Sequence, residues 1–134
     1  MSPRFLLDTH VLIRWLSAPR LLSREQTRVL REAVRRREPV AISAITLLEI
    51  AILADKRTSS REIPVDKLFM ALESDPFLQT VPLTVEIAAE VAALGPSLRD
   101  PSDRAIVATA RVRNLRLLTS DRRIIESNLV AVVA

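Results

Sequence analysis

The stretch "FLLDTHVL", residues 5–12, places one aspartate between two apolar segments. The run at 4–8 is short and apolar, as expected of a buried strand, and the pattern at 9–18 predicts a helix. Asp8 therefore follows a strand and precedes a helix. In "LRLLTSD", residues 115–121, Asp121 occupies the corresponding position. Ligands of open parallel α/β sheets bind beyond the carboxyl ends of the strands, so both aspartates are expected at one sheet edge.

The same alternation of short apolar runs and helical patterns continues along the chain. Further strands are predicted at 40–42, 78–82 and 116–119, with a fifth candidate at 129–133, and helices at 22–37, 44–55, 65–73, 84–94 and 101–113. Pro19 ends the first helix, and Ser23 with Gln26 has the spacing of a capping box. Gly95, followed by Pro96, stops the helix at 84–94. The pattern predicts a single α/β domain over 1–134, an α/β/α sandwich with a mainly parallel central sheet.

The composition excludes several classes of protein. The 134 residues include no cysteine and one histidine, which excludes disulfides, zinc–thiolate sites and thiol catalysis and disfavours a Ser-His-Asp triad. One glycine is too few for a glycine-rich phosphate loop. Charged residues interrupt both long apolar runs, so we expect a soluble, cytoplasmic protein. The net charge of +4, carried mainly by arginine, is compatible with an acidic polymer as partner.

Glu49 lies in "AISAITLLEIAILA", residues 41–54, which is apolar nearly all round and predicts a largely buried helix. A buried, unpaired carboxylate is costly, so Glu49 needs a cation, a metal ion or a proton. No lysine or arginine lies within one helical turn of it. A metal ion is therefore favoured over a distant arginine as its partner.

The segment "RDPSDRAIVATA", residues 99–110, holds two aspartates at the start of a predicted helix. Pro101 suits the first helical position, which makes Asp100 the N-cap and puts Asp103 in the first turn. The cap is then filled, and Asp103 is free to point elsewhere. On local sequence alone, a favourable interaction with the helix dipole, worth about 0.3–1 kcal/mol, accounts for Asp103.

The four carboxylates change that interpretation when they are considered together. At one sheet edge, their charges would repel each other, and a divalent ion would resolve the repulsion. Oxygen ligands without histidine or cysteine select hard cations such as Mg²⁺ or Mn²⁺. Such an ion activates water and offsets charge on a phosphodiester, while arginines hold the backbone. The acids expected to form this catalytic metal site for nucleic-acid cleavage are Asp8, Glu49, Asp103 and Asp121.

The sequence also resembles the PIN-domain ribonucleases of the VapC type, toxins of bacterial toxin–antitoxin pairs. The resemblance rests on "LLDTHVLIRWL" (6–16), "ISAITLLEIAIL" (42–53), "DPSDRAIVATA" (100–110) and "LLTSD" (117–121), in that order. It implies a Mg²⁺- or Mn²⁺-dependent endoribonuclease that cleaves structured RNA at few sites through metal-activated water. It further implies a homodimer and a tight complex with a small, VapB-like antitoxin that blocks the active site.

The family pattern maps its metal ligands onto the same four acids, Asp121 being the one most easily displaced from direct contact. It leaves Asp100 as a helix cap beside them that reaches the metal through water. Where many relatives have an aromatic residue between the two aspartates, this chain has Ser102, which bears on the pocket rim and the substrate rather than on a metal ligand.

Other residues are weaker candidates. The hydroxyls of Thr9 and Thr119 either hold a carboxylate or water, or bond to the local backbone. Arg104 and Arg122, together with Arg123, flank proposed ligands and are candidates for phosphate contact.

Several side chains are better explained by packing or solvation. His10 is more often a packed or surface residue than a catalytic base, and Trp15 fits the core, a dimer surface or a groove for an antitoxin helix. An arginine stripe on the second helix is read as a solvated face, with Glu32 pairing at i±4 with Arg28 and Arg36. Its members are Arg24, Arg28, Arg31 and Arg35.

Two alternatives come from other functional classes. A phospho-accepting receiver domain also clusters aspartates, but it requires a lysine near the last strand, and the lysines here lie at 56 and 67. A catalytically silent PIN-like module that acts as an antitoxin-binding partner would bind metal without cleaving RNA. A DNA-cutting nuclease and an RNA-processing role remain as variants of the enzymatic reading.

Overall fold

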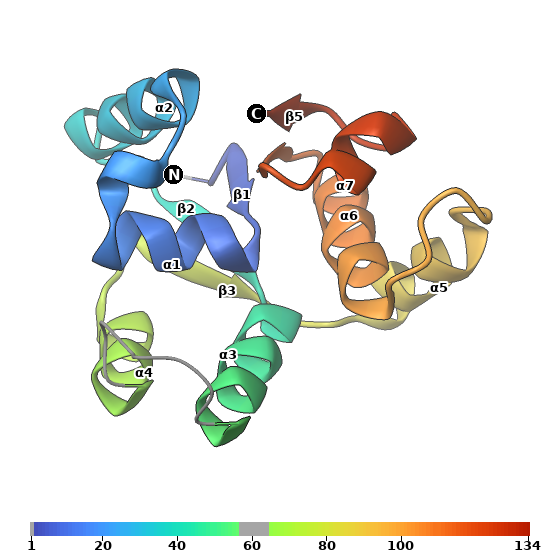
Figure 1. Ribbon diagram of the computed structural model, residues 1–134, viewed down its shortest axis with the longest axis horizontal. Coiled ribbons are helices and arrows are strands. Elements are labelled where there is room, and N and C mark those ends of the chain that lie inside the picture. Colours follow the sequence, from blue (N-terminus) through green and yellow to red (C-terminus); the bar gives the residue numbers. More distant parts are fainter. Residues whose placement is uncertain (1, 57–64) are drawn as a thin grey trace.

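One parallel sheet organises the protein. The computed structural model describes residues 2–56 and 65–134, and in this part of the chain five parallel strands pair in the order β3-β2-β1-β4-β5 (Figure 1). The strands are β1 (Phe5–Leu7), β2 (Val40–Ser43), β3 (Leu78–Val81), β4 (Arg116–Leu118) and β5 (Val132–Val133). The predicted α/β class and parallel sheet are confirmed, including the fifth strand, which is shorter than expected.

Helices connect every pair of consecutive strands. They are α1 (Thr9–Ser17), the 3₁₀ helix η1 (Pro19–Leu21), α2 (Arg24–Arg35), α3 (Ala44–Lys56), α4 (Val65–Ser74), α5 (Val85–Ala93), α6 (Pro101–Arg113) and α7 (Arg122–Ser127). The range predicted at 22–37 is shorter at both ends, and η1 precedes it. No helix is predicted from the sequence at 122–127, where α7 lies, because six residues are too few to show a helical period.

Alternate residues of each strand face opposite layers of helices. Leu7, Ile42 and Leu118 belong to a buried cluster with side chains of α1, α2 and α4. Their neighbours in sequence, Leu6, Ala41 and Leu117, belong to a second cluster with side chains of α5, α6 and α7. This period of two buries each central strand on both faces, and the result is a sandwich of three layers (Figure 1).

The order of the strands creates a switch point between β1 and β4. From β1 the chain adds β2 and then β3 on one side, and it then returns to place β4 on the other side of β1. Because crossovers between parallel strands are right-handed, this reversal moves the connecting helices to the opposite face of the sheet. Such a reversal leaves a crevice beyond the carboxyl ends of the two strands, where ligands bind. Asp8 follows β1, and Thr119 follows β4.

Local signals set most helix ends. The predicted capping box of α2 is confirmed, because Ser23 Oγ accepts from the N–H of Gln26 and the Gln26 side chain accepts from the N–H of Ser23. Helix α5 ends at Ala93, and Gly95 follows with φ of +82°, a conformation that favours glycine. Asn114 takes the left-handed conformation after α6.

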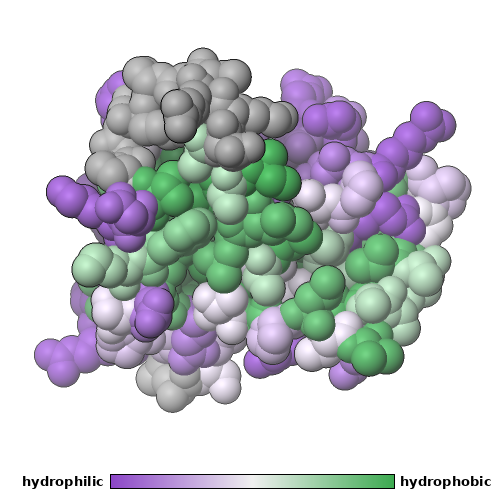
Figure 2. Space-filling model, turned by 90° about the horizontal axis from the view of Figure 1, so that it is seen from below, coloured by the Kyte–Doolittle hydropathy of each residue, from purple (hydrophilic) through white to green (hydrophobic). Residues whose placement is uncertain are grey.

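The prediction of a largely buried helix at 44–55 is wrong. Leu48 is 53% exposed and Ile52 is 45% exposed, whereas Thr46 and Ile50 point inward. Helix α3 therefore has an apolar outer face that other elements described by the structure leave open. Figure 2 shows this face among the apolar side chains that spread across the lower surface of the molecule.

Within residues 2–56 and 65–134, the helices are all too short or too polar to cross a membrane.

Candidate active site

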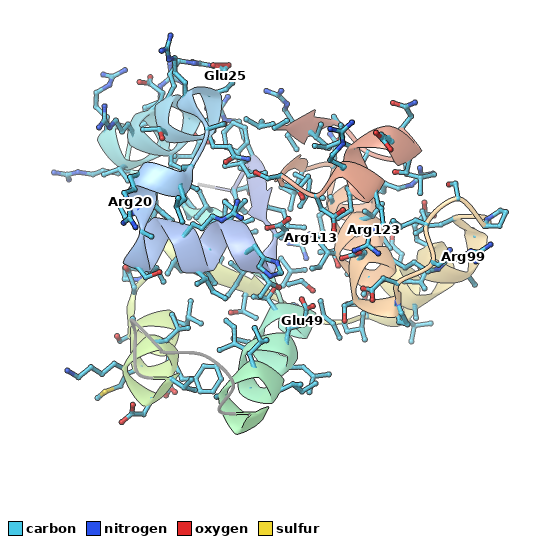
Figure 3. All side chains as sticks on the ribbon, viewed as in Figure 1. Arg20, Glu25, Glu49, Arg99, Arg113 and Arg123 are labelled. Atoms are coloured by element: carbon cyan, nitrogen blue, oxygen red, sulfur yellow. The ribbon has the colours of Figure 1, made fainter. Side chains whose placement is uncertain are left out.

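A pocket of about 190 Å³ lies at the switch point of the sheet. Its walls come from the segments that follow β1, β2 and β4 and from the start of α6. The lining residues are Asp8, Thr9, His10, Glu49, Asp100, Asp103, Ile106, Asp121 and Arg123. All four acids predicted as metal ligands are therefore brought to one pocket from distant parts of the chain. In the view of Figure 3, Glu49 and Arg123 appear near the centre of the picture, whereas Arg20, Glu25 and Arg99 appear toward its edges.

Two hydrogen bonds orient Asp8 at the start of α1. Its Oδ1 accepts from the N–H of Val11 at 2.8 Å, which makes it the N-cap of the helix, and its Oδ2 accepts from the hydroxyl of Thr119. The residue is only 6% exposed, and this burial raises the pKa of Asp8 although both hydrogen bonds act in the opposite direction. The energetic cost of keeping this carboxylate ionised in the pocket is lowered by a cation.

Glu49 reaches the pocket from α3 and is oriented by Thr9. The Thr9 hydroxyl donates to Glu49 Oε1 and lies 3.1 Å from the Thr46 hydroxyl. A carboxylate only accepts, so the single hydroxyl proton of Thr9 is directed to Glu49. Glu49 is half-buried rather than enclosed in the core, because the outer side of α3 is open.

Asp100 and Asp103 divide the work at the start of α6. Asp100 Oδ2 accepts from the N–H of Asp103 at 2.9 Å, so Asp100 is the N-cap, as predicted. Asp103 is partly buried, and burial is the largest cause that raises its pKa to about 6. The charges of Asp100, Asp121 and Glu49 add to this effect. The other carboxylates of the pocket thus affect the pKa of Asp103, which would not be needed if the residue only interacted with the helix dipole.

Asp121 begins α7. Its Oδ1 accepts from the N–H of Arg123 at 2.8 Å, and its own N–H donates to the Thr119 hydroxyl at 3.1 Å. Thr119 thus contacts both Asp8 and Asp121, so the two alternatives for its hydroxyl, carboxylate and local backbone, are both realised. The Arg123 guanidinium lies 3.7 Å from Asp121 Oδ1, the side chain is 80% exposed, and Arg123 is one of the residues that line the pocket.

The chemistry of the donor set fits a hard divalent cation. The pocket offers carboxylate and hydroxyl oxygens, with the imidazole of His10 at its exposed rim, and burial together with the neighbouring carboxylates raises the pKa of Asp103. In the described part of the chain, however, no three acidic or histidine side chains are already arranged to hold one ion. The expected four-carboxylate centre is therefore not preformed, and the ligand assignment stays a prediction that requires the side chains to draw closer.

A family model described as the PIN domain matches residues 5–127. The chain belongs to the PIN-domain family. It is 36% identical over 120 residues to Ribonuclease VapC22 of Mycobacterium tuberculosis, which covers 89% of this chain and 88% of that relative. The predicted resemblance to VapC-type members of the family is thereby confirmed.

Solved structures share the fold over nearly the whole length. A toxin–antitoxin complex from Klebsiella pneumoniae has 26% identity and a TM-score of 0.64, with 96% of this chain and 95% of that chain covered. VapBC2 from Rickettsia felis, bound to a DNA fragment from its promoter, has a TM-score of 0.73 and covers 96% of both chains. At 16% identity, the second likeness shows the fold alone.

Two of the arginines proposed for phosphate contact have other roles in this PIN domain. The guanidinium of Arg104 donates to the carbonyls of Val91, Gly95 and Leu98, each at 2.6 Å, and so ties α6 to the end of α5. Arg122 is 87% exposed, pairs with Glu126 at 3.2 Å and does not line the pocket. Arg123, the third candidate, is the arginine that lines it.

The predicted pairing of Glu32 on α2 is confirmed for Arg36 and wrong for Arg28. Glu32 pairs with Arg35 and Arg36, and Arg28 pairs with Glu25 at i,i+3. The expected pair of Arg28 with Glu32 is replaced because Glu25 lies one turn earlier on the same face. Trp15 packs against Phe77, with ring centroids 5.8 Å apart, and also lines a groove beside α2.

Gln26 has a contact to the site that the sequence analysis missed. Its side chain bonds to Thr119 and Ser120, directly before Asp121. Its capping-box spacing explained the residue locally, and no sequence signal indicated a second partner 93 residues away.

Proposed function

We propose that this PIN domain is a Mg²⁺- or Mn²⁺-dependent endoribonuclease and the toxin of a toxin–antitoxin pair. The observation that carries the proposal is the convergence of four carboxylates from separate segments on one pocket at the switch point. The membership of the PIN-domain family and the 36% identity to a ribonuclease support it. The net charge of +4 places this acidic pocket in a basic protein, which suits a polyanionic substrate.

The residues of the pocket divide into three roles under this proposal. Asp8, Glu49, Asp103 and Asp121 hold the ion, with Asp100 as the helix cap beside them. When bound, such an ion lowers the pKa of water and offsets the charge that develops on a phosphodiester.

The remaining contacts orient these acids and bind the substrate. Thr119 and Thr9 keep the carboxylates of Asp8 and Glu49 turned toward the pocket through their hydroxyl groups. Arg123 binds a phosphate of the RNA, because among the arginines near the proposed ligands it is the one that lines the pocket, and its side chain is exposed.

Cleavage of total bacterial RNA by purified protein tests this function. Lanes contain Mg²⁺ or Mn²⁺, a chelator, or the variants Asp8→Asn and Asp103→Asn. We expect discrete fragments that disappear with the chelator and with each variant. Intact RNA from folded, metal-loaded, antitoxin-free protein would contradict the enzymatic proposal and favour the silent, antitoxin-binding module. Equal cleavage by the variants would indicate a contaminating nuclease, and cleavage of DNA instead would identify the other polynucleotide as substrate.

The toxin role is supported by a groove between α1, η1 and α2. It has a volume of about 500 Å³ and apolar walls that include Trp15, Leu30 and Val34, and Arg20 and Arg31 lie along it. An acidic amphipathic segment of a small antitoxin fits this combination of apolar walls and basic rim. Solved structures with this fold include toxin–antitoxin complexes, among them the one from Klebsiella pneumoniae.

Growth arrest on expression, relieved by co-expression of a short reading frame next to the gene, is the expected behaviour of a toxin. Cleavage of RNA in vitro without any growth arrest would favour an RNA-processing role.

We also propose a homodimer formed through the apolar outer face of α3. Leu48 and Ile52 on α3, with Leu83 and Val85 where α5 begins, are large apolar side chains that are 45–87% exposed. Figure 2 shows apolar side chains extending across this side of the molecule. Large exposed apolar patches of this kind mark protein interfaces, and a second copy of the chain offers a self-complementary surface.

A further inference from the structure

Gln26 is a polar side chain on α2 with no exposed surface. Its Oε1 accepts from the N–H of Ser23 at 3.1 Å, which completes the capping box. Its Nε2 faces three further acceptors, the carbonyls of Thr119 and Val133 at 3.2 Å and the Ser120 hydroxyl at 3.3 Å. The backbone N–H and the two carbonyls leave one consistent orientation of the amide, because each of them either only donates or only accepts. Capping thus accounts for the Oε1 atom of Gln26 but not for its Nε2 group.

The Nε2 group of Gln26 bonds to the backbone at the carboxyl ends of β4 and β5. The carbonyl of Leu118 accepts from the N–H of Asp8 at 3.0 Å, and the N–H of Thr119 donates to Val133 at 3.2 Å. Thr119 directly follows β4, and its carbonyl lies beyond this ladder. A buried carbonyl without a hydrogen-bond partner is unfavourable, and the amide of Gln26 supplies the partner.

Thr119 connects the hydrogen bond from Gln26 with the residues of the pocket. Its hydroxyl donates to Asp8 and accepts from the N–H of Asp121 at 3.1 Å, and the residue is completely buried. A shift of the Thr119 peptide therefore moves the hydroxyl that orients Asp8 and the backbone that carries Asp121. The chain of contacts runs from α2 through the turn at 119–121 to both carboxylates.

We infer that Gln26 is a positioning residue that fixes the turn at 119–121 and, through it, the carboxylates of Asp8 and Asp121. The consequence for catalysis rests on the proposed function, in which these two acids hold the metal ion. Groups that support metal ligands change metal affinity or activity about 10- to 100-fold when they are removed. Gln26 acts through Thr119, so we expect an effect at the lower end of this range.

Three variants separate positioning from capping. Gln26→Glu keeps an acceptor for the capping box but turns a carboxylate, instead of two N–H groups, toward the carbonyls of Thr119 and Val133. Gln26→Met keeps the length of the side chain and loses all of its hydrogen bonds. Ser23→Ala is the matched control, since it weakens the cap of α2 and leaves the donors of Gln26 in place.

Three readouts are measured on the full chain. These are the affinity for Mn²⁺ alone by calorimetric titration, kcat and KM for RNA cleavage, and amide hydrogen exchange of the segment 119–124. Both Gln26 variants are expected to bind Mn²⁺ about tenfold more weakly, to lose about tenfold in kcat at unchanged KM, and to exchange faster in this segment. Ser23→Ala is expected to stay within about twofold of the parent protein in both affinity and kcat.

If folded Gln26→Met has the Mn²⁺ affinity and the hydrogen exchange of the parent protein, the inference is overturned. It is also overturned if Ser23→Ala loses as much Mn²⁺ affinity and kcat as the Gln26 variants, because that result would show a general loosening of α2. If both variants fail to fold, Gln26→Asn keeps the amide one methylene too short to reach, and the same criteria apply. A parent protein that binds Mn²⁺ but cleaves no RNA would contradict the proposed function and leave the positioning role standing. A parent protein that binds no Mn²⁺ leaves hydrogen exchange to decide.

Discussion

Asp103 lies in the pocket at a position where its charge is unfavourable for the metal-free fold. Its neighbour Asp100 already caps α6, so the second carboxylate gives the helix little more than a dipole interaction. In the metal-free protein, burial and then repulsion by the other acids raise the pKa of Asp103 to about 6. A carboxylate that costs stability in the absence of a ligand is typical of a binding position.

Replacing Asp103 by asparagine should therefore stabilise the metal-free protein while abolishing cleavage. The folded-state pKa lies above the unfolded value, so ionised Asp103 destabilises the fold as pH rises through about 6, and the neutral amide does not. After allowance for solvent screening of this partly exposed group, we expect a gain of about 1 kcal/mol at pH 7.5. Calorimetric unfolding with a chelator should show a higher Tm at pH 7.5 and a smaller difference at pH 5.

Added Mn²⁺ should reverse that order, because the ion stabilises the parent protein and the variant has lost a ligand. A variant with the parent Tm at pH 7.5, or with the same gain at both pH values, would contradict this account.

Arg123 and Arg122 form a matched pair at the residue scale. They are adjacent, similarly exposed and equally charged, but Arg123 lines the pocket and Arg122 pairs with Glu126. Arg123→Ala should raise KM for RNA about tenfold and reduce the slope of log K against log salt by about one phosphate contact. Arg122→Ala should change KM by less than about twofold. Equal effects of the two substitutions would mean that Arg123 contributes general charge and no specific contact.

Among the elements, three helices begin at the pocket with an aspartate. Asp8, Asp100 and Asp121 are the N-caps of α1, α6 and α7. Capping holds each carboxylate at a helix start, where the free N–H groups also favour negative charge. The parallel sheet brings these helix starts to one edge, because each of α1 and α7 follows a strand directly. Three helix caps therefore line one pocket.

Arg104 joins the helices α5 and α6. Replacing it by methionine leaves three carbonyls of the α5–α6 connection without their donor and should lower the free energy of unfolding by about 2–4 kcal/mol. At temperatures where the variant is folded, KM for RNA should be unchanged. Chemical denaturation and steady-state kinetics measure the two quantities. A raised KM with parent-like stability would restore Arg104 as a phosphate contact.

At the scale of the whole molecule, the apolar face of α3 predicts self-association. The double variant Leu48→Asp, Ile52→Asp places two charges on this exposed face and should convert a dimer to a monomer. Leu21→Asp, at an exposed apolar side chain on η1, is the control and should leave the mass in solution unchanged. Sedimentation velocity separates the two states. A monomeric parent protein, or a double variant that remains a dimer, would contradict the assignment of this face.

Much of the architecture was predictable because it depends on short-range pattern. The short apolar runs at 4–8, 40–42 and 116–119 reflect strands buried on both faces, and proline, glycine and N-cap residues mark helix ends over a few residues. The division of labour between Asp100 and Asp103 follows from Pro101 alone. The grouping of the four acids was also predictable, because parallel strands have their carboxyl ends on the same side.

Contacts between distant segments were not predictable in this way. Arg104 follows the N-cap Asp100 by four residues and Arg123 follows the N-cap Asp121 by two, yet Arg104 bonds to carbonyls at the end of α5 and Arg123 lines the pocket. A long side chain with five donors bonds to whichever acceptors lie within its reach, and those acceptors come from other parts of the chain. The same holds for Gln26, whose partners lie 93 to 107 residues away, and for α3, whose exposed face depends on which helices cover it. Backbone pattern is set by neighbouring residues, whereas the direction of a polar side chain is set by the segments that folding brings beside it.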